Sequence, residues 1–195
     1  DEIDVEKVFV ITTSAGGASG IKMAIDYPSR VNGLVLLSSD MPTTQKYPEE
    51  ISGITGPPAL LVNDFPMWFV INHFGFVMNV MMASDVPDDF YETMLPVKPR
   101  KVGIKNDESI TNLDMAINYN DYPVEELSLP ILLVHAKDDP LAKFDEVEKF
   151  IEKVQPRTAI FETGGHLITG HEDEVSKSIK SFIEEVGKTT SNNNN

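Results

Sequence analysis

The most constraining feature of this sequence is an apolar strand that stops at a run of small residues and continues as a helix. Residues 8–11 are continuously apolar, which is typical of a strand buried on both faces of a parallel sheet. The small residues at 12–17 predict a sharp turn, and apolar positions at helical spacing over 18–25 predict a helix that ends before Pro28. A second apolar run follows at 33–37. Strand, helix and strand within about thirty residues predict a βαβ unit with parallel strands.

The same alternation returns near the other end of the chain. Residues 130–135 predict a third buried strand, and 145–154 a helix. Residues 158–161 predict a short fourth strand, and the apolar stripe over 175–186 predicts a closing amphipathic helix. The expected fold class is therefore α/β, with a mostly parallel sheet and flanking helices.

The stretch between these two parts has a different pattern. It is punctuated by prolines and rich in methionine and phenylalanine, and we expect helices at 67–82, 87–95 and 109–119. The apolar run at 65–82 contains Pro66 and two asparagines, so we expect no membrane span there. We interpret the whole stretch as a small helical cap.

These patterns divide the chain into four segments. We assign 1–41 and 123–188 to the α/β core, 42–122 to the cap, and 189–195, which holds only Thr, Ser and Asn, to a disordered tail. A length of 195 residues is enough for one core and a small cap.

Charge and composition exclude several classes of function. The net charge is −15, which argues against binding to nucleic acid or to an anionic membrane surface. The absence of cysteine excludes disulfides, thiol catalysis and cysteine metal sites, and no His/Asp/Glu spacing suggests a metal. We expect no cofactor, and a start without a signal-like segment favours the cytoplasm.

Three residues that suit nucleophilic catalysis follow predicted strands. Ser14 lies at the turn after the first strand, where Gly16 would let the chain fold back closely. Asp139 follows the third strand, and His166 lies in a glycine-bearing loop after the fourth. Each has a plainer interpretation, as a turn serine, a turn aspartate before Pro140, or a loop histidine. The order Ser, Asp, His at the same sheet edge favours a catalytic set.

Other polar residues are weaker candidates. Asp40, after the second strand, is an alternative acid, with a turn role favoured. His171 fits the start of the last helix better than the site. His135, which ends a strand, is interpreted as a packed residue, and His73 as a cap histidine that could touch substrate.

Several segments together resemble the α/β-hydrolase fold family. They are Thr12-Thr13-Ser14-Ala15-Gly16-Gly17, Tyr27-Pro28-Ser29-Arg30-Val31, Leu34-Val35-Leu36-Leu37-Ser38, His135-Ala136-Lys137-Asp138-Asp139-Pro140 and Gly164-Gly165-His166. The resemblance implies that Ser14 is the nucleophile, His166 the base and Asp139 the acid, with the Ala15 amide in the oxyanion hole. Two positions depart from the family pattern: Thr12 replaces the first glycine of G-x-S-x-G, and Ala136 the glycine of G-x-x-D.

The resemblance covers residues 8–40 and 128–187 and leaves the family's first strands without a counterpart. The loop that supplies the second oxyanion amide is among the parts without one. Because one lost donor costs roughly 10²–10³ in turnover, we expect this chain to be a weak or inactive catalyst. The strand at 8–11 would have a bare edge, which we expect to pair with a missing N-terminal segment or with a second copy in a homodimer.

The resulting hypothesis is a serine hydrolase that cleaves esters of small to medium hydrophobic substrates. The cap would line the substrate pocket with Met67, Phe69, His73 and Phe74. A serine at position 14 speaks against dehalogenase or epoxide hydrolase chemistry, which in this fold needs an aspartate. The alternative is an inactive hydrolase remnant that serves as a binding or oligomerisation domain.

Overall fold

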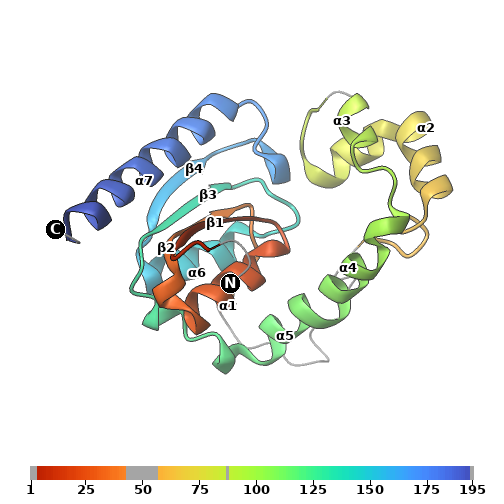
Figure 1. Ribbon diagram of the computed structural model, residues 1–195. Helices are drawn as coiled ribbons and strands as arrows, with labels where there is room; N and C mark the ends of the chain where they lie inside the picture. Colours follow the sequence, from red (N-terminus) through yellow and green to blue (C-terminus); the bar gives the residue numbers. More distant parts are fainter. Residues whose placement is uncertain (1–3, 43–56, 87, 194–195) are drawn as a thin grey trace.

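A four-stranded parallel sheet lies at the centre of the computed structural model, which describes residues 4–42, 57–86 and 88–193 (Figure 1). Its strands, in spatial order, are β1 (Val8–Thr13), β2 (Val31–Leu37), β3 (Ile131–Ala136) and β4 (Arg157–Phe161). Thr13 lies opposite Leu37, which in turn lies opposite Val134. The carboxyl ends of the strands therefore meet at one edge of the sheet. Within the described residues, β1 pairs on one side only.

Helices cover both faces of the sheet. They are α1 (Gly16–Asp26), α6 (Phe144–Val154) and α7 (Glu172–Asn193). Leu34 and Leu36 belong to the apolar cluster that includes α1 and α6, whereas Val35 packs in the cluster that includes Phe182 of α7. This alternation along β2 follows the two-residue period of a strand. The expected α/β class with a parallel sheet and flanking helices is confirmed.

The cap follows β2 and forms a helical layer beside the core (Figure 1). Its helices are α2 (Asp64–Met82), α3 (Asp88–Glu92), α4 (Lys101–Asn106), a π-helical turn (Asp107–Thr111) and α5 (Asn112–Ile117). Short 3₁₀ segments lie at Pro28–Arg30, Lys98–Arg100, Tyr119–Asp121, Val124–Glu126 and Gly165–Leu167. The cap has an apolar cluster of its own, which includes Met67, Ile71, Met78 and Tyr91.

The structure differs from the sequence prediction mainly in helix lengths. The helix expected at 109–119 is the end of a helical stretch that begins at Lys98, where polar residues and Gly103 hide any apolar period. Helix α7 continues to Asn193, so 189–193 of the expected disordered tail are helical. Extending an existing helix costs far less than starting one, which lets Thr, Ser and Asn continue it.

By length and composition alone, helix α2 is long and apolar enough to cross a membrane. In the structure, 22% of its 18-residue apolar stretch is buried. It also has features of a cap helix. The backbone is kinked at Phe74, beside Gly75, and Met67, Ile71 and Met78 pack into the cap cluster. The expectation of no membrane span stays a prediction.

Candidate active site

Ser14 sits in a strained turn between β1 and α1. Its φ of 51° lies in the left-handed region, which a non-glycine residue rarely adopts. The Ser14 amide donates to the Leu37 carbonyl at 3.0 Å, which ties the turn to the neighbouring strand. Strained backbone of this kind clusters at functional sites. The sharp turn expected after the first strand is therefore observed at the serine itself.

The close backbone approach occurs at Gly17 and Gly20 rather than at Gly16. A Cβ on Gly17 would lie 2.5 Å from Cβ of Ser39, whereas one on Gly16 would meet Thr12 at an ordinary 3.7 Å. A Cβ on Gly20 would lie 2.5 Å from Cγ2 of Thr12. The absence of a side chain at Gly20 thus leaves space for Thr12, which replaces the first glycine of the G-x-S-x-G pattern.

His166 bridges Ser14 and Asp139. Its Nε2 lies 2.9 Å from Ser14 Oγ, and its Nδ1 lies 2.9 and 3.1 Å from the two carboxylate oxygens of Asp139. An ionised carboxylate can only accept, so the ring proton belongs on Nδ1 and leaves Nε2 as an acceptor for the serine hydroxyl. His166 and Asp139 are buried, at 8% and 4% exposure. The structure therefore brings together the three side chains that the sequence singled out.

Asp139 is held by the turn that follows β3. Its Oδ1 accepts hydrogen bonds from the amides of Leu141 (2.8 Å) and Ala142 (3.0 Å). These bonds fix the position of the carboxylate beside the imidazole. Asp40, the alternative acid, follows β2. The two carboxylate oxygens within hydrogen-bond distance of His166 Nδ1 both belong to Asp139.

The neighbouring Asp138 holds the histidine loop instead of the ring. Its carboxylate accepts from the amides of Gly165 (2.8 Å) and Gly164 (3.3 Å). Gly164 and Gly165 have φ values of 133° and 60°, where a side chain would be strained. The two adjacent aspartates therefore support His166 in different ways.

His135 is a second buried histidine, and it lies close to Asp139. It is fully buried, its Nε2 lies 2.8 Å from the Ala142 carbonyl, and Asp139 is 3.8 Å away. Burial lowers the pKa of His135, which outweighs the opposing influence of Asp139. The ring is therefore neutral and donates to the Ala142 carbonyl, the residue whose amide bonds Asp139.

Ala15 is the N-cap residue of α1 and follows Ser14 directly. Its amide lies at the positive end of the helix dipole, where an oxyanion formed at Ser14 would be stabilised.

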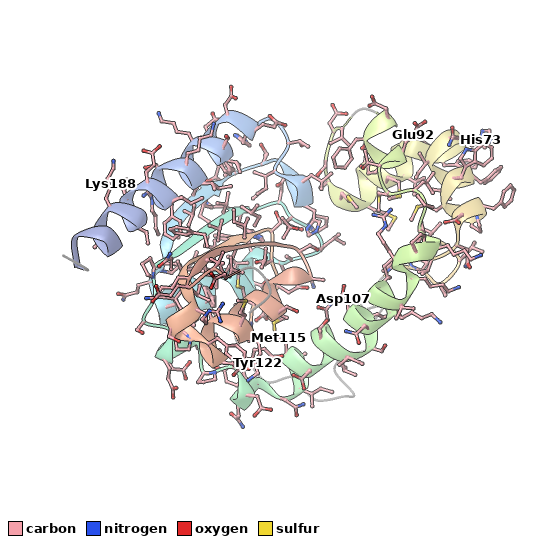
Figure 2. The ribbon with its side chains drawn as sticks, in the orientation of Figure 1. His73, Glu92, Asp107, Met115, Tyr122 and Lys188 are labelled. Carbon is pink, nitrogen blue, oxygen red and sulfur yellow. The ribbon has the colours of Figure 1, made fainter. Side chains whose placement is uncertain are left out.

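The four cap residues expected to line the substrate pocket lie on α2, and that role stays a prediction. Met67 is 4% exposed inside the cap cluster, while Phe69 and Phe74 are 43% and 44% exposed. His73 packs against the rings of Trp68 and Phe69 at the outer end of the cap (Figure 2). None of the four contacts Ser14, Asp139 or His166 through a hydrogen bond or ring contact in the described part of the chain. Helix α2 therefore has a face buried in the cap cluster and an exposed aromatic face.

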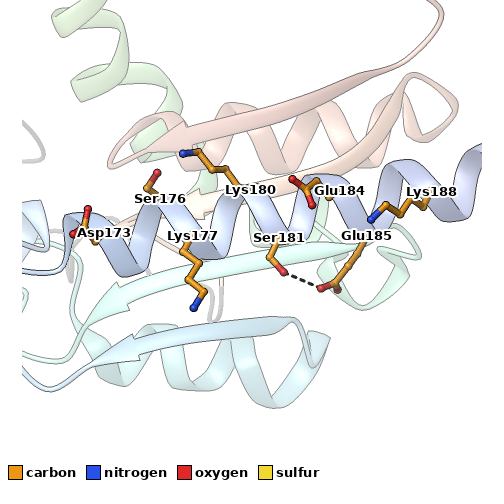
Figure 3. Close-up of a pocket in the computed structure, with 8 residues that line it drawn as sticks. All are labelled: Asp173, Ser176, Lys177, Lys180, Ser181, Glu184, Glu185 and Lys188. Carbon is orange, nitrogen blue, oxygen red and sulfur yellow. Dashed lines mark hydrogen bonds between the residues drawn. The ribbon is translucent and has the colours of Figure 1, made fainter.

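Two further features involve α7 and the residues just before it. His171 stacks on Phe161 with ring centroids 4.1 Å apart, just before α7. A groove runs along α7 and is lined by acidic, basic and serine side chains (Figure 3). One of them, Glu185, already pairs with Ser181 and Arg157. Over residues 4–42, 57–86 and 88–193, no group of three potential metal ligands comes together.

Sequence reasoning missed two residues that support the site. They are Asp138, which is next to the predicted acid Asp139, and Ser84, which follows α2 and belongs to no recognisable motif. Ser84 Oγ accepts from the Leu167 amide (3.2 Å) and donates toward the Gly164 carbonyl (3.3 Å). Only the tertiary contact between cap and loop reveals this role.

Comparison with known proteins agrees with the fold. No family model matches the chain. It is 27% identical over 176 residues to the 2-hydroxy-6-oxononadienedioate/2-hydroxy-6-oxononatrienedioate hydrolase of Cupriavidus pinatubonensis. That alignment covers 85% of this chain and 58% of the relative, so the chain spans less than two thirds of the relative's length.

Solved structures give the same result. A meta-cleavage product hydrolase from Pseudomonas fluorescens IP01 matches with a TM-score of 0.66 and 18% identity, over 94% of this chain and 66% of that one. A lipase-esterase related protein from Clostridium acetobutylicum matches with a TM-score of 0.58 and 20% identity, over 91% and 67%. The chain has the α/β-hydrolase fold, and these similar proteins are hydrolases or related to them.

Proposed function

We propose that this chain is a serine hydrolase that cleaves carboxylic esters of small to medium hydrophobic substrates. The observation that carries the proposal is the continuous set of hydrogen bonds from Ser14 through His166 to Asp139. Such a set on an elbow at the carboxyl edge of a parallel sheet suits acyl transfer. The substrate is a small molecule, and we place the enzyme in the cytoplasm.

The reaction follows from the positions of the protons. Ser14 Oγ attacks the ester carbonyl carbon while its proton moves to His166 Nε2. The negative charge that forms on the carbonyl oxygen is stabilised by the Ala15 amide. Asp139 stabilises the imidazolium, which then protonates the leaving alkoxide as the C–O bond breaks. Water, deprotonated by His166, then attacks the acyl-enzyme. The imidazolium returns this proton to Ser14 Oγ as the acyl C–O bond breaks, which releases the acid and free Ser14.

A second candidate substrate class comes from the similar proteins. The curated relative acts on 2-hydroxy-6-oxo dienedioates, and a meta-cleavage product hydrolase is among the structures that match. A 2-hydroxy-6-oxo-dienedioate should therefore be assayed beside short p-nitrophenyl esters. Faster turnover of the dienedioate would replace the ester in our proposal and leave the roles of the three residues unchanged.

Covalent labelling tests the nucleophile without knowledge of the substrate. A fluorophosphonate should label the wild-type chain, and Ser14→Ala should abolish the label because no other hydroxyl is bonded to His166 Nε2 among the described residues. Ser19→Ala is the matched control, because Ser19 is an exposed serine on α1, and it should label normally. Equal labelling of the wild type and Ser14→Ala would refute the proposal.

A rival proposal is a catalytically inert binding or oligomerisation domain. It is favoured by β1, which within the described residues pairs only with β2 and so offers an edge to another strand, either from a second copy or from an N-terminal segment. Light scattering on the purified chain separates the two. A monomer that labels and turns over ester excludes the inert domain, and an unlabelled dimer supports it.

A further inference from the structure

The loop that carries His166 is held from two sides, and one of these sides is the cap. Asp138 holds the loop from the core through the amides of Gly164 and Gly165. Ser84, in the connection that follows α2, holds it from the cap. Ser84 is only 4% exposed, and its partners Gly164 and Leu167 flank the histidine closely in sequence.

The contacts of Ser84 are directional. Its Oγ accepts from the Leu167 amide at 3.2 Å, and its single proton is shared between the carbonyls of Met82 (2.9 Å) and Gly164 (3.3 Å). The hydroxyl therefore joins the last turn of α2 to both flanks of His166. Removing it would leave polar groups of a buried loop with fewer partners, which costs more than the bonds contribute.

The backbone around Ser84 leaves little freedom for this junction. Ala83 ends α2 in the left-handed region, with φ of 47°, and its carbonyl lies against Gly165. A Cβ on Gly165 would lie 2.1 Å from that carbonyl oxygen. The end of α2 and the residue before His166 are thus in direct contact, so a displacement of α2 would move the loop.

We propose that Ser84 is a positioning residue that couples the cap to the orientation of His166. The proposal rests on the function proposed above, because it gives Ser84 its effect through the base of that reaction. Ser84 does not touch the reacting atoms. It keeps His166 Nε2 at 2.9 Å from Ser14 Oγ only while α2 is seated on the loop.

Two substitutions separate hydrogen bonding from packing. Ser84→Ala removes the hydroxyl, whereas Ser84→Cys keeps a side chain of nearly the same shape with much weaker hydrogen bonds. With p-nitrophenyl butyrate we expect Ser84→Ala to lower kcat about 10-fold, and Ser84→Cys about 3-fold, because small misplacements of catalytic groups are costly. KM should stay within about 2-fold of the wild type, since uniform substrate binding is unaffected.

Ser109→Ala is the matched control. It is the same substitution in the same cap, and the Ser109 hydroxyl is exposed and bonds the Lys105 carbonyl within its own helical stretch. We expect it to keep wild-type kcat and KM. A wild-type kcat for Ser84→Cys would show that Ser84 acts by packing alone and would overturn the proposal. So would a raised KM with unchanged kcat in Ser84→Ala.

A spectroscopic readout keeps this test independent of turnover. The Nδ1 proton of His166, bonded to Asp139, should give a far-downfield proton NMR signal, which Ser84→Ala should broaden or shift and Ser109→Ala should leave in place. If the wild type proves inactive, the proposed function fails, but the NMR comparison still decides whether Ser84 positions His166. An unchanged signal in a folded Ser84→Ala or Ser84→Cys variant would contradict the proposal.

Discussion

The core and the cap of this chain differ in how much of their apolar surface is buried. In the core, Leu34, Leu36 and Leu133 have no exposed surface, and every described strand is paired in parallel. In the cap, α2 buries one face in a small cluster and leaves Phe65 and Phe76 at 72% and 65% exposure. The core can therefore hold a strained turn such as the one at Ser14 in place. The cap buries less of its surface, so its side chains are held less firmly.

The candidate site reflects this division. Ser14, Asp139 and His166 follow β1, β3 and β4, so their spacing is set by the sheet. The cap meets the loop of His166 where Ala83 and Ser84 contact Gly165 and Leu167. In our proposal the reaction takes place on residues of the core, and the cap influences it through Ser84.

The largest effect should come from the core acid. Asp139→Asn keeps the shape but lets the side chain donate to His166, which favours the wrong tautomer, and the same change in a serine-protease triad costs about 10⁴-fold in kcat. Steady-state ester hydrolysis measures it. Asp138→Asn is the matched comparison, and we expect a loss below about 10-fold because the remaining oxygen still accepts the shorter bond, from the Gly165 amide. Equal losses would mean that the roles of the two aspartates are not distinct.

A cavity in the core should destabilise the whole chain. Phe150 of α6 is fully buried under the sheet, and Phe150→Ala should lower the free energy of unfolding by about 3–5 kcal/mol. Urea denaturation followed by circular dichroism gives this value. A loss below about 1 kcal/mol would mean that the sheet and α6 do not form the main cooperative unit.

A cavity in the cap should act locally. Ile71→Ala, in the cap cluster, should remove hydrogen-exchange protection from α2 and α3 while amides of β2 and β3 stay protected. The loss of protection should correspond to about 2–4 kcal/mol. If protection falls equally in the sheet, core and cap unfold as one body, and the comparison drawn above is wrong.

The sequence predicted the core far better than the cap, for a physical reason. Buried parallel strands such as 131–136 have continuous apolar runs, and turn geometry restricts Ser14 and His166 to small and glycine-rich surroundings. Cap residues such as Phe69 and Phe74 are apolar without being buried, so their pattern does not tell pocket from surface. The role of Ser84 could not be predicted from the sequence, because it depends on a contact with residues about 80 positions away.

Acidification should affect the core through His135. Burial lowers its pKa in the folded protein, so below about pH 6.5 the unfolded chain binds more protons, and the free energy of unfolding falls as pH decreases. Asp139 and His166 are the charged or titratable groups that act on it. Urea midpoints between pH 5 and 7.5 should fall less steeply for His135→Gln than for the wild type. His73→Gln, the same change at an exposed cap position, should follow the wild-type curve.

The smallest effect is expected on the exposed aromatic face of the cap. Phe65 is 72% exposed and stacks only on its helix neighbours Trp68 and Phe69 among the ring contacts of the described residues. Phe65→Ser should therefore change the free energy of unfolding by less than about 0.5 kcal/mol. Met67→Ser, two residues along the same helix but 4% exposed, should cost several times more. A loss above about 1 kcal/mol for Phe65→Ser would mean that this face is covered in solution, and that the cap is as firmly packed as the core.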